Sequence, residues 1–139
     1  MIKLDNSRTF DDNQSNMAKK VLVVDDDQYI RELYEEVMKT EGYDVESASD
    51  GLIAYDLLKK GGFDLILLDV MLPKMDGFRI LDKLKEEPPT KPNGVVILLT
   101  NLDHGPLIKD AFEKGVTEFM VKADITPSDL INSAHKYLD

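Results

Sequence analysis

Four short apolar runs in this sequence of 139 residues each end at polar side chains. They are residues 21–24 before Asp25 and Asp26, 65–68 before Asp69, 95–99 before Thr100, and 119–121 before Lys122. Such runs are typical of strands in a parallel sheet that is covered on both faces. Because the carboxyl ends of parallel strands meet at one edge, the pattern predicts a cleft there with three carboxylates, a hydroxyl and an ammonium.

Helical patterns alternate with these runs. The strands are expected at residues 21–25, 43–47, 63–69, 95–100 and 117–121, and apolar residues at helical spacing mark helices within 29–38, 53–58, 78–84, 106–114 and 126–138. Gly42 is placed to end the first helix, and Thr126 followed by Pro127 is typical of a helix start. The alternation predicts an α/β domain in which five helices flank a mainly parallel, five-stranded sheet with right-handed crossovers.

Composition limits the classes of function. The formal charge of −10 argues against non-specific attraction to nucleic acid or to an anionic membrane surface. The sequence has no Cys, which excludes disulfides and thiolate zinc sites. No apolar stretch approaches the roughly 20 residues of a membrane span, and no signal peptide is evident. We therefore expect a cytoplasmic protein, and no metal-binding role for the isolated His104 and His135.

The amino-terminal segment differs in composition from the rest of the chain. Residues 5–16 are rich in Asp, Asn, Ser and Gln, and Phe10 is their only large apolar residue. Such a segment buries too little apolar surface to offset the entropy of ordering it. We expect residues 1–18 to be a disordered tail and residues 19–139 to form one domain. A docking arm that carries Phe10 is the alternative.

The expected cluster of Asp25, Asp26 and Asp69 brings like charges together. Repulsion within such a cluster raises the pKa of at least one carboxyl group, and a bound cation relieves it. A set of carboxylate oxygens with water suits Mg²⁺, and a backbone carbonyl just after Asp69, such as that of Met71, would complete the ligands. The sequence therefore predicts a magnesium site at the carboxyl edge of the sheet.

The same residues suit phosphoryl transfer. Asp69 is the candidate nucleophile, Lys122 supplies a positive charge for the phosphoryl oxygens, and Thr100 supplies a hydroxyl donor. Taken singly, each has a plainer interpretation, as a turn former, a helix cap or a solvated side chain. The sequence lacks the competing signatures GxxxxGK[ST], GxGxxG after a strand, HExxH and GxSxG. The coincidence of all these strand ends therefore favours the phosphoryl site.

Four segments together resemble the receiver domain of two-component response regulators. They read VLVVDDDQYIRE, LILLDVMLPKMDGFRIL, VVILLTN and EFMVK, and the resemblance covers about residues 19–138. It implies a flavodoxin-like fold whose five parallel strands lie in the order 2-1-3-4-5. Because the chain ends after the fifth expected helix, it resembles stand-alone, chemotaxis-type receivers without an output domain. A fragment of a longer regulator or hybrid kinase is the alternative.

The resemblance also assigns roles to individual residues. It implies that Asp69 accepts a phosphoryl group from a histidine kinase or a histidine phosphotransfer protein. Asp25, Asp26, Asp69 and the Met71 carbonyl would hold Mg²⁺, and Thr100 and Lys122 would bind the phosphoryl group. Phe119, three residues before Lys122, matches the family's switch aromatic, and a plain core or edge aromatic is the alternative interpretation. Dimers through the face formed by the fourth helix, fifth strand and fifth helix are implied by resemblance only.

The sequence departs from the family pattern after Thr100 and after Lys122, and two further positions bear on hydrolysis. Ala123 follows Lys122 where the family usually has a cis proline, and since a non-proline cis bond costs about 3 kcal/mol, we expect a trans peptide. Asn101 stands after Thr100, where a small residue is common. Met71 and Leu102 are apolar at positions that tune hydrolysis in the family, so we expect slow loss of the phosphoryl group.

These observations predict a phosphorylation-controlled switch that catalyses only its own phosphoryl transfer and hydrolysis. It would act on an unknown downstream protein, without direct contact to nucleic acid or membrane. Two alternatives remain. One is a receiver-fold interaction domain that works without phosphorylation. The other is an Mg²⁺-dependent phosphatase with an aspartate nucleophile, which usually carries a DxD motif and a cap domain, neither of which is evident around Asp69.

Overall fold

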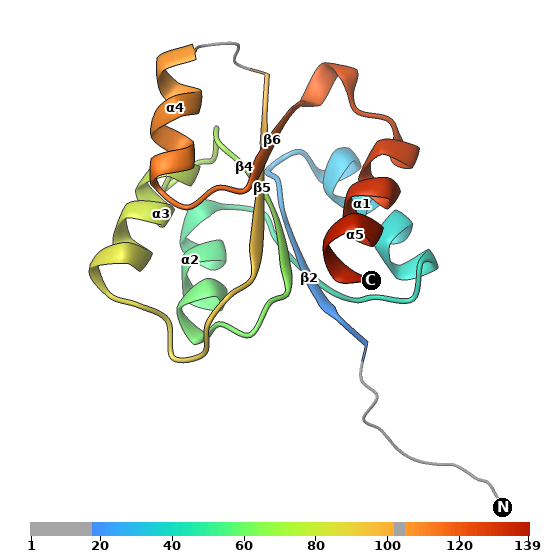
Figure 1. Cartoon of the computed structure of the whole chain (residues 1–139), viewed down its shortest axis with the longest axis horizontal. Coiled ribbons are helices and arrows are strands. Elements are labelled where there is room, and N and C mark those ends of the chain that lie inside the picture. Colours follow the sequence, from blue (N-terminus) through green and yellow to red (C-terminus); the bar gives the residue numbers. More distant parts are fainter. Residues whose placement is uncertain (1–17, 102–104) are drawn as a thin grey trace, which may run out of the picture.

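The computed structural model describes residues 18–101 and 105–139, which form a five-stranded parallel sheet with helices on both faces (Figure 1). The strands are β2 (Lys20–Val24), β3 (Asp44–Ala48), β4 (Leu65–Asp69), β5 (Val95–Thr100) and β6 (Glu118–Val121). The helices are α1 (Gln28–Thr40), α2 (Gly51–Lys60), α3 (Gly77–Glu86), α4 (Gly105–Glu113) and α5 (Pro127–Leu138), with a short 3₁₀ helix η1 (Lys122–Asp124). The strands lie in the order β3-β2-β4-β5-β6, which confirms the predicted fold.

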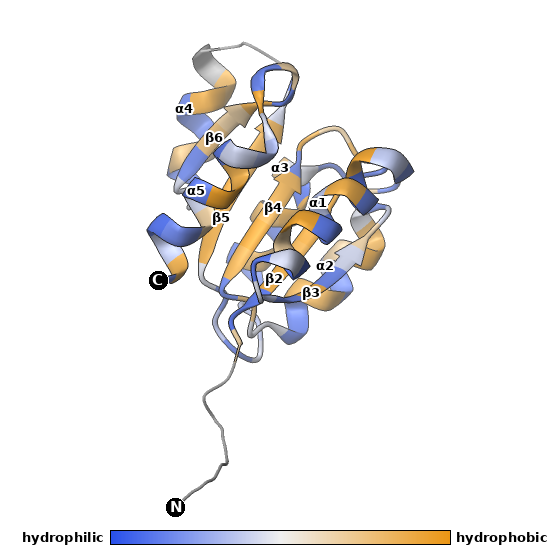
Figure 2. Cartoon of the chain, turned by 90° about the vertical axis from the view of Figure 1, so that its right-hand side faces the viewer, coloured by the Kyte–Doolittle hydropathy of each residue, from blue (hydrophilic) through white to orange (hydrophobic). Residues whose placement is uncertain are grey.

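The sheet separates two apolar cores. Helices α2, α3 and α4 cover one face, and α1 and α5 cover the other (Figure 1). Successive strand residues alternate between the cores, so that Leu22 and Ile66 pack toward α2 and α3, whereas Val23 and Leu67 pack toward α1 and α5. Figure 2 shows the resulting apolar centre between helices whose outer faces are polar.

Burial differs strongly between the strands. All five residues of the central strand β4 are buried, whereas every residue of the edge strand β6 is half-buried. Four of the helices begin at a residue whose side chain caps the helix and which lies on the connection after a strand. The capping residues are Asp27 for α1, Asp50 for α2, Asp76 for α3 and Thr126 for α5. The helices therefore begin beside the carboxyl edge of the sheet, where anionic groups are favourable.

Most element boundaries agree with the sequence patterns. Gly42 has the positive φ of 93° expected after α1, and Thr126 forms a capping box with Asp129 behind Pro127. The third strand begins at Leu65 rather than at Phe63, and η1 was not predicted. The described residues contain no cis peptide bond, so the Lys122–Ala123 peptide is trans, as expected. The predictions about the tail, Phe10, Leu102 and His104 fall outside the described residues.

None of the helices in the described part of the chain has the length and apolar character needed to span a bilayer.

His135 joins the ends of α1 and α5, although the sequence shows it as an isolated residue. Its Nε2 lies 2.8 Å from Glu41 Oε1, and its Nδ1 contacts the Asp139 carboxylate and the Tyr43 hydroxyl. Hydrogen bonds to Asp139 and then Glu41 raise the pKa of His135 above its ordinary value. The ring therefore links two carboxylates at the ends of the two helices, and these carboxylates favour its charged form.

A pH-dependent loss of stability is expected for His135→Gln. Since the folded protein raises the pKa of His135, the stabilisation is full below the unfolded pKa of about 6.5 and is lost as pH rises through the folded pKa. Urea unfolding should thus show a larger difference between wild type and variant near pH 6 than near pH 9. Equal differences at both pH values would contradict this role of the charged ring.

Candidate functional site

Asp25, Asp26 and Asp69 meet at the carboxyl edge of the sheet. Asp69 is the last residue of β4, and Asp25 follows β2, whose Val24 pairs in register with Leu68. One carboxylate oxygen from each aspartate lies within 4.8 Å of the others. Asp25 and Asp69 are buried, with exposed fractions of 0% and 3%, whereas Asp26 is exposed. The predicted cluster of carboxylates is therefore present, with one member open to solvent.

Lys122 reaches this cluster from the end of β6. Its Nζ lies 2.7 Å from Asp25 Oδ2 and 3.1 Å from Asp69 Oδ2, and its side chain is 14% exposed. Burial by itself would lower the pKa of Lys122, but the hydrogen bond to Asp25 and the charge of Asp69 outweigh burial and raise it. The ammonium is thus held charged between two carboxylates.

The charges in the cluster do not balance. Among the described residues, three carboxylates in this cluster share one lysine ammonium, so negative charges outnumber positive ones. Burial raises the pKa of Asp69 above its ordinary value, with Lys122 opposing that shift and Asp25 adding to it. Asp25 Oδ2 is fully buried and, beyond its ion pair with Lys122, has no aligned hydrogen bond with the described residues. The arrangement favours an additional positive charge beside Asp25 and Asp69.

Backbone groups and one arginine fix the two buried carboxylates. The N–H of Asp27 donates to Asp25 Oδ1 at 2.9 Å, and the N–H of Met71 donates to Asp69 Oδ1 at 3.2 Å. Arg31 Nη1 donates to the Asp25 carbonyl at 2.9 Å. Sequence reasoning missed Arg31, whose only signal was its place in the first turn of a helix that starts beside Asp25. Each carboxylate therefore offers its Oδ2 to the centre of the site.

Thr100 and Phe119 lie on the strands that lead to the site. Thr100 ends β5, is 4% exposed and pairs in register with Val121. Phe119 is half-buried on β6 and packs against the core beneath α2, α3 and α4. Its ring meets the ring of Phe112 on α4 edge to face, with centroids 6.4 Å apart. The structure thus places Thr100 at the acidic edge and Phe119 against α4.

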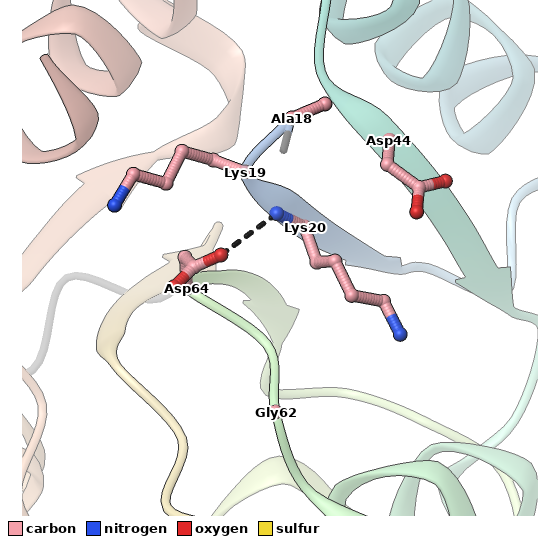
Figure 3. Close-up of a pocket in the computed structure, with 6 residues that line it drawn as sticks. All are labelled: Ala18, Lys19, Lys20, Asp44, Gly62 and Asp64. Carbon is pink, nitrogen blue, oxygen red and sulfur yellow. Dashed lines mark hydrogen bonds between the residues drawn. The ribbon is translucent and has the colours of Figure 1, made fainter. Parts of the chain in front are cut away.

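A separate pocket opens at the other end of the sheet (Figure 3). It is lined by Ala18, Lys19, Lys20, Asp44, Gly62 and Asp64. The backbone N–H of Lys20 donates to Asp64 there, and the Lys20 ammonium pairs with Glu46 at 3.3 Å. Lys20 begins β2, whereas Asp25 follows its carboxyl end, so this pocket is not part of the acidic site.

The comparisons with known proteins agree with this geometry. The chain is 35% identical over 106 residues to the transcriptional regulatory protein SrrA of Staphylococcus aureus, a match covering 76% of this chain and 42% of that protein. The chain thus spans less than half the length of this relative.

Solved structures show the same likeness. The Vibrio cholerae chemotaxis protein CheY4 matches with 30% identity and a TM-score of 0.77, over 88% of this chain and 100% of that one. The receiver domain of the Francisella response regulator 1452 matches with 28% identity and a TM-score of 0.76, over 86% and 95%. The family profile described as "Response regulator receiver domain" matches residues 21–135. The chain therefore belongs to the response regulator receiver domain family.

Proposed function

We propose that this receiver domain is a phosphorylation-controlled cytoplasmic switch of a two-component phosphorelay, in which Asp69 accepts a phosphoryl group. The donor would be a histidine kinase or a histidine phosphotransfer protein. The observation that carries the proposal is the joint placement of three carboxylates within 4.8 Å and a buried lysine ammonium 3.1 Å from Asp69. In this role the domain is a signalling protein that acts chemically only on itself.

The residues at the site fit a divalent cation. Its candidate ligands are all oxygens, from Asp25, Asp26, Asp69 and the Met71 carbonyl, which suits Mg²⁺. The uncompensated charge and the buried Asp25 Oδ2 supply the electrostatic reason for binding. When bound, Mg²⁺ would screen the negative charge of the incoming phosphoryl group. All three carboxylates come from the ends of neighbouring strands, so the site is largely formed before a cation arrives.

The chain's own groups account for the transfer. An oxygen of Asp69 forms a bond to phosphorus as the phosphorus–nitrogen bond of the donor phosphohistidine breaks, and the imidazole leaves with the electron pair. The Lys122 ammonium, now 3.1 Å from Asp69 Oδ2, would then pair with a phosphoryl oxygen. Burial of Asp69 keeps bulk water away from the acyl phosphate.

The switch would act through Thr100 and Phe119. Phosphorylation adds acceptor oxygens at Asp69, and a donor hydroxyl from Thr100 moving toward them would open space beneath it. Phe119 would turn into that space and leave Phe112, which it now meets at 6.4 Å. The surface of α4, β6 and α5 would change, and with it the binding of a downstream protein or of a second copy. Nucleic acid and membranes are not expected partners of this acidic domain.

A small phosphodonor tests the proposal. The chain is incubated with acetyl phosphate and Mg²⁺, and its intact mass is measured beside Asp69→Asn. We expect one phosphoryl adduct that requires both Asp69 and the metal ion. Turnover of external phosphate esters would support the phosphatase alternative instead. A folded protein without adduct from any donor would support an interaction domain that works without phosphorylation.

The lifetime of the adduct is part of the same measurement. Met71 is 62% exposed beside Asp69, and its side chain carries no strong hydrogen-bonding group that orients a water for attack. We therefore expect the phosphoryl group to persist well beyond minutes on the isolated chain. Decay within minutes or less would contradict the role given to Met71 and Leu102.

A further inference from the structure

The loop that follows Asp69 is fastened to the first turn of α2. Loop residues 70–76 contact α2 at three points. The Gly51 N–H donates to the Pro73 carbonyl at 3.1 Å, and Lys74 Nζ lies 3.4 Å from Asp50 Oδ2. Gly51 also packs so closely that a Cβ at this position would lie 1.6 Å from the Met75 carbonyl oxygen. The loop and the helix start therefore fit together only when residue 51 is glycine.

Asp50 connects the helix to the loop through both of its carboxylate oxygens. Its Oδ1 accepts from the Ile53 N–H and caps α2, while Oδ2 faces the Lys74 ammonium. The residue is 8% exposed, so its orientation is set by packing as well as by these partners. Asp50 thus links the position of the helix start to that of the loop.

The loop has a conformation that the chain does not adopt without support. Lys74 has a φ of +72°, the only positive φ of a non-glycine residue among residues 18–101 and 105–139. At the base of the loop, the Gly77 N–H donates to the Val70 carbonyl at 2.8 Å. Met71, between base and tip, is anchored by its N–H to Asp69 and not by its exposed side chain. Within the loop, the Met75 N–H donates to the Pro73 carbonyl at 2.8 Å across Lys74, and the contacts with Asp50 and Gly51 outside the loop add to this support.

We propose that Asp50, Gly51 and Lys74 are positioning residues for the divalent-cation site, since they hold the loop that presents the Met71 backbone to Asp69. This inference rests on the proposed function, because it assigns the loop's fixed shape to cation binding. Within the described part of the chain, none of the three residues forms a hydrogen bond or ion pair with Asp25, Asp26 or Asp69. They act on it through the backbone of residues 71–75. Outer residues that orient metal ligands commonly change metal affinity about 10- to 100-fold when removed.

The competing explanation is that Lys74 and Asp50 form a surface ion pair with no effect on the shape of the loop, since the Lys74 side chain is 60% exposed. The two explanations predict opposite signs for Lys74→Met. Removing a positive charge from the neighbourhood of a cation site, with no change in the loop, tightens Mg²⁺ binding. Loosening the loop weakens Mg²⁺ binding. The direction of the change therefore separates electrostatics from positioning.

Isothermal titration of the full chain with Mg²⁺ tests the inference. For Lys74→Met we expect about two- to fivefold weaker binding, the size of one partly exposed ion pair. Lys74→Arg, which keeps the charge, should stay within about twofold of wild type. Asp50→Asn keeps a good helix cap but removes the partner of Lys74. The double variant should be no weaker than the weaker of the two single variants, because both act through one contact.

Gly51→Ala gives the largest expected change. Its Cβ displaces the Met75 carbonyl, and we expect Mg²⁺ binding to weaken about tenfold or more. In amide NMR spectra, the Met71 resonance should shift and the Gly51 amide of Lys74→Met should exchange faster than in wild type. If Gly51→Ala does not fold, the Mg²⁺ affinities of the Lys74 and Asp50 variants alone decide whether the loop positions the cation site.

The outcomes distinguish this inference from the proposed function. If wild type binds Mg²⁺ and Lys74→Met binds it equally or more tightly, the positioning role is overturned while the proposed function stands. Additive effects of Asp50→Asn and Lys74→Met would also overturn it. If wild type itself binds no Mg²⁺, both proposals fall.

Discussion

Lys122→Met is expected to destabilise the protein by about 3 kcal/mol in the absence of divalent cations, and Mg²⁺ should restore most of the loss. The substitution removes the only ammonium that residues 18–101 and 105–139 place between Asp25 and Asp69, whose side chains are 0% and 5% exposed. Breaking a buried pair from one side leaves a buried charge without compensation, which typically costs about 3–5 kcal/mol. A cation bound to the same oxygens would replace the missing charge. Urea unfolding with EDTA and with Mg²⁺ measures both effects.

Lys114→Met provides the matched control for this prediction. Lys114 Nζ also lies between two carboxylates, 2.6 Å from Asp82 and 3.4 Å from Asp110, and its side chain is 18% exposed. Those carboxylates are 42% and 49% exposed, so they remain solvated when the Lys114 ammonium is removed. We expect a smaller loss of stability and no rescue by Mg²⁺. Equal rescue of both variants would show that Mg²⁺ acts elsewhere than at Asp25 and Asp69.

Asp26→Asn should weaken Mg²⁺ binding about tenfold or more while leaving the free protein at least as stable as wild type. Asp26 is exposed, and its carboxylate makes no hydrogen bond or ion pair with the described part of the chain. Its removal therefore breaks nothing in the free protein and relieves repulsion from Asp25 and Asp69. Calorimetric titration with Mg²⁺ and thermal unfolding without metal ions measure the two quantities.

Asp27→Asn is the control, because it removes the same charge one residue further along. The Asp27 side chain caps α1 through the Ile30 N–H, a task that asparagine performs equally well. Since Asp27 is not part of the carboxylate cluster, we expect Mg²⁺ affinity within about twofold of wild type. Equal weakening by both substitutions would indicate a general charge effect and not a ligand at position 26.

The fold and the membership of the carboxylate cluster could be predicted because both depend on local patterns. Each strand end is visible as an apolar run followed by a polar residue, and parallel pairing then brings Asp25 and Asp69 together. The sequence does not show which partners a side chain chooses across the sheet. Lys122 is predicted at the same edge, but the sequence does not show that its ammonium pairs directly with both Asp25 and Asp69. This pairing depends on the burial of Lys122, which the assembled sheet creates.

The loop contacts lay beyond sequence reasoning for a related reason. Gly51 is one of eight glycines, and nothing near it in the sequence indicates that it packs against the Met75 carbonyl. Lys74 likewise gave no sign of its positive φ, because lysine is seldom found in that conformation. The contact of Phe119 with Phe112 joins β6 to α4, and its geometry is set by tertiary packing. Long-range fit, and not local propensity, decides each of these features.

Because the strands are unequally buried, the two sides of the site differ in how easily they move. Asp69 ends β4, whose residues are all buried, whereas Lys122 follows β6, whose residues are all half-buried. A strand with one neighbour and partial cover opens locally at a lower free energy than the central strand of the same sheet. A force between Asp69 and Lys122 therefore displaces the edge and leaves the centre in place. If Asp69 is phosphorylated as proposed, a chemical change at the buried central strand would thus cause movement of the half-buried edge strand β6.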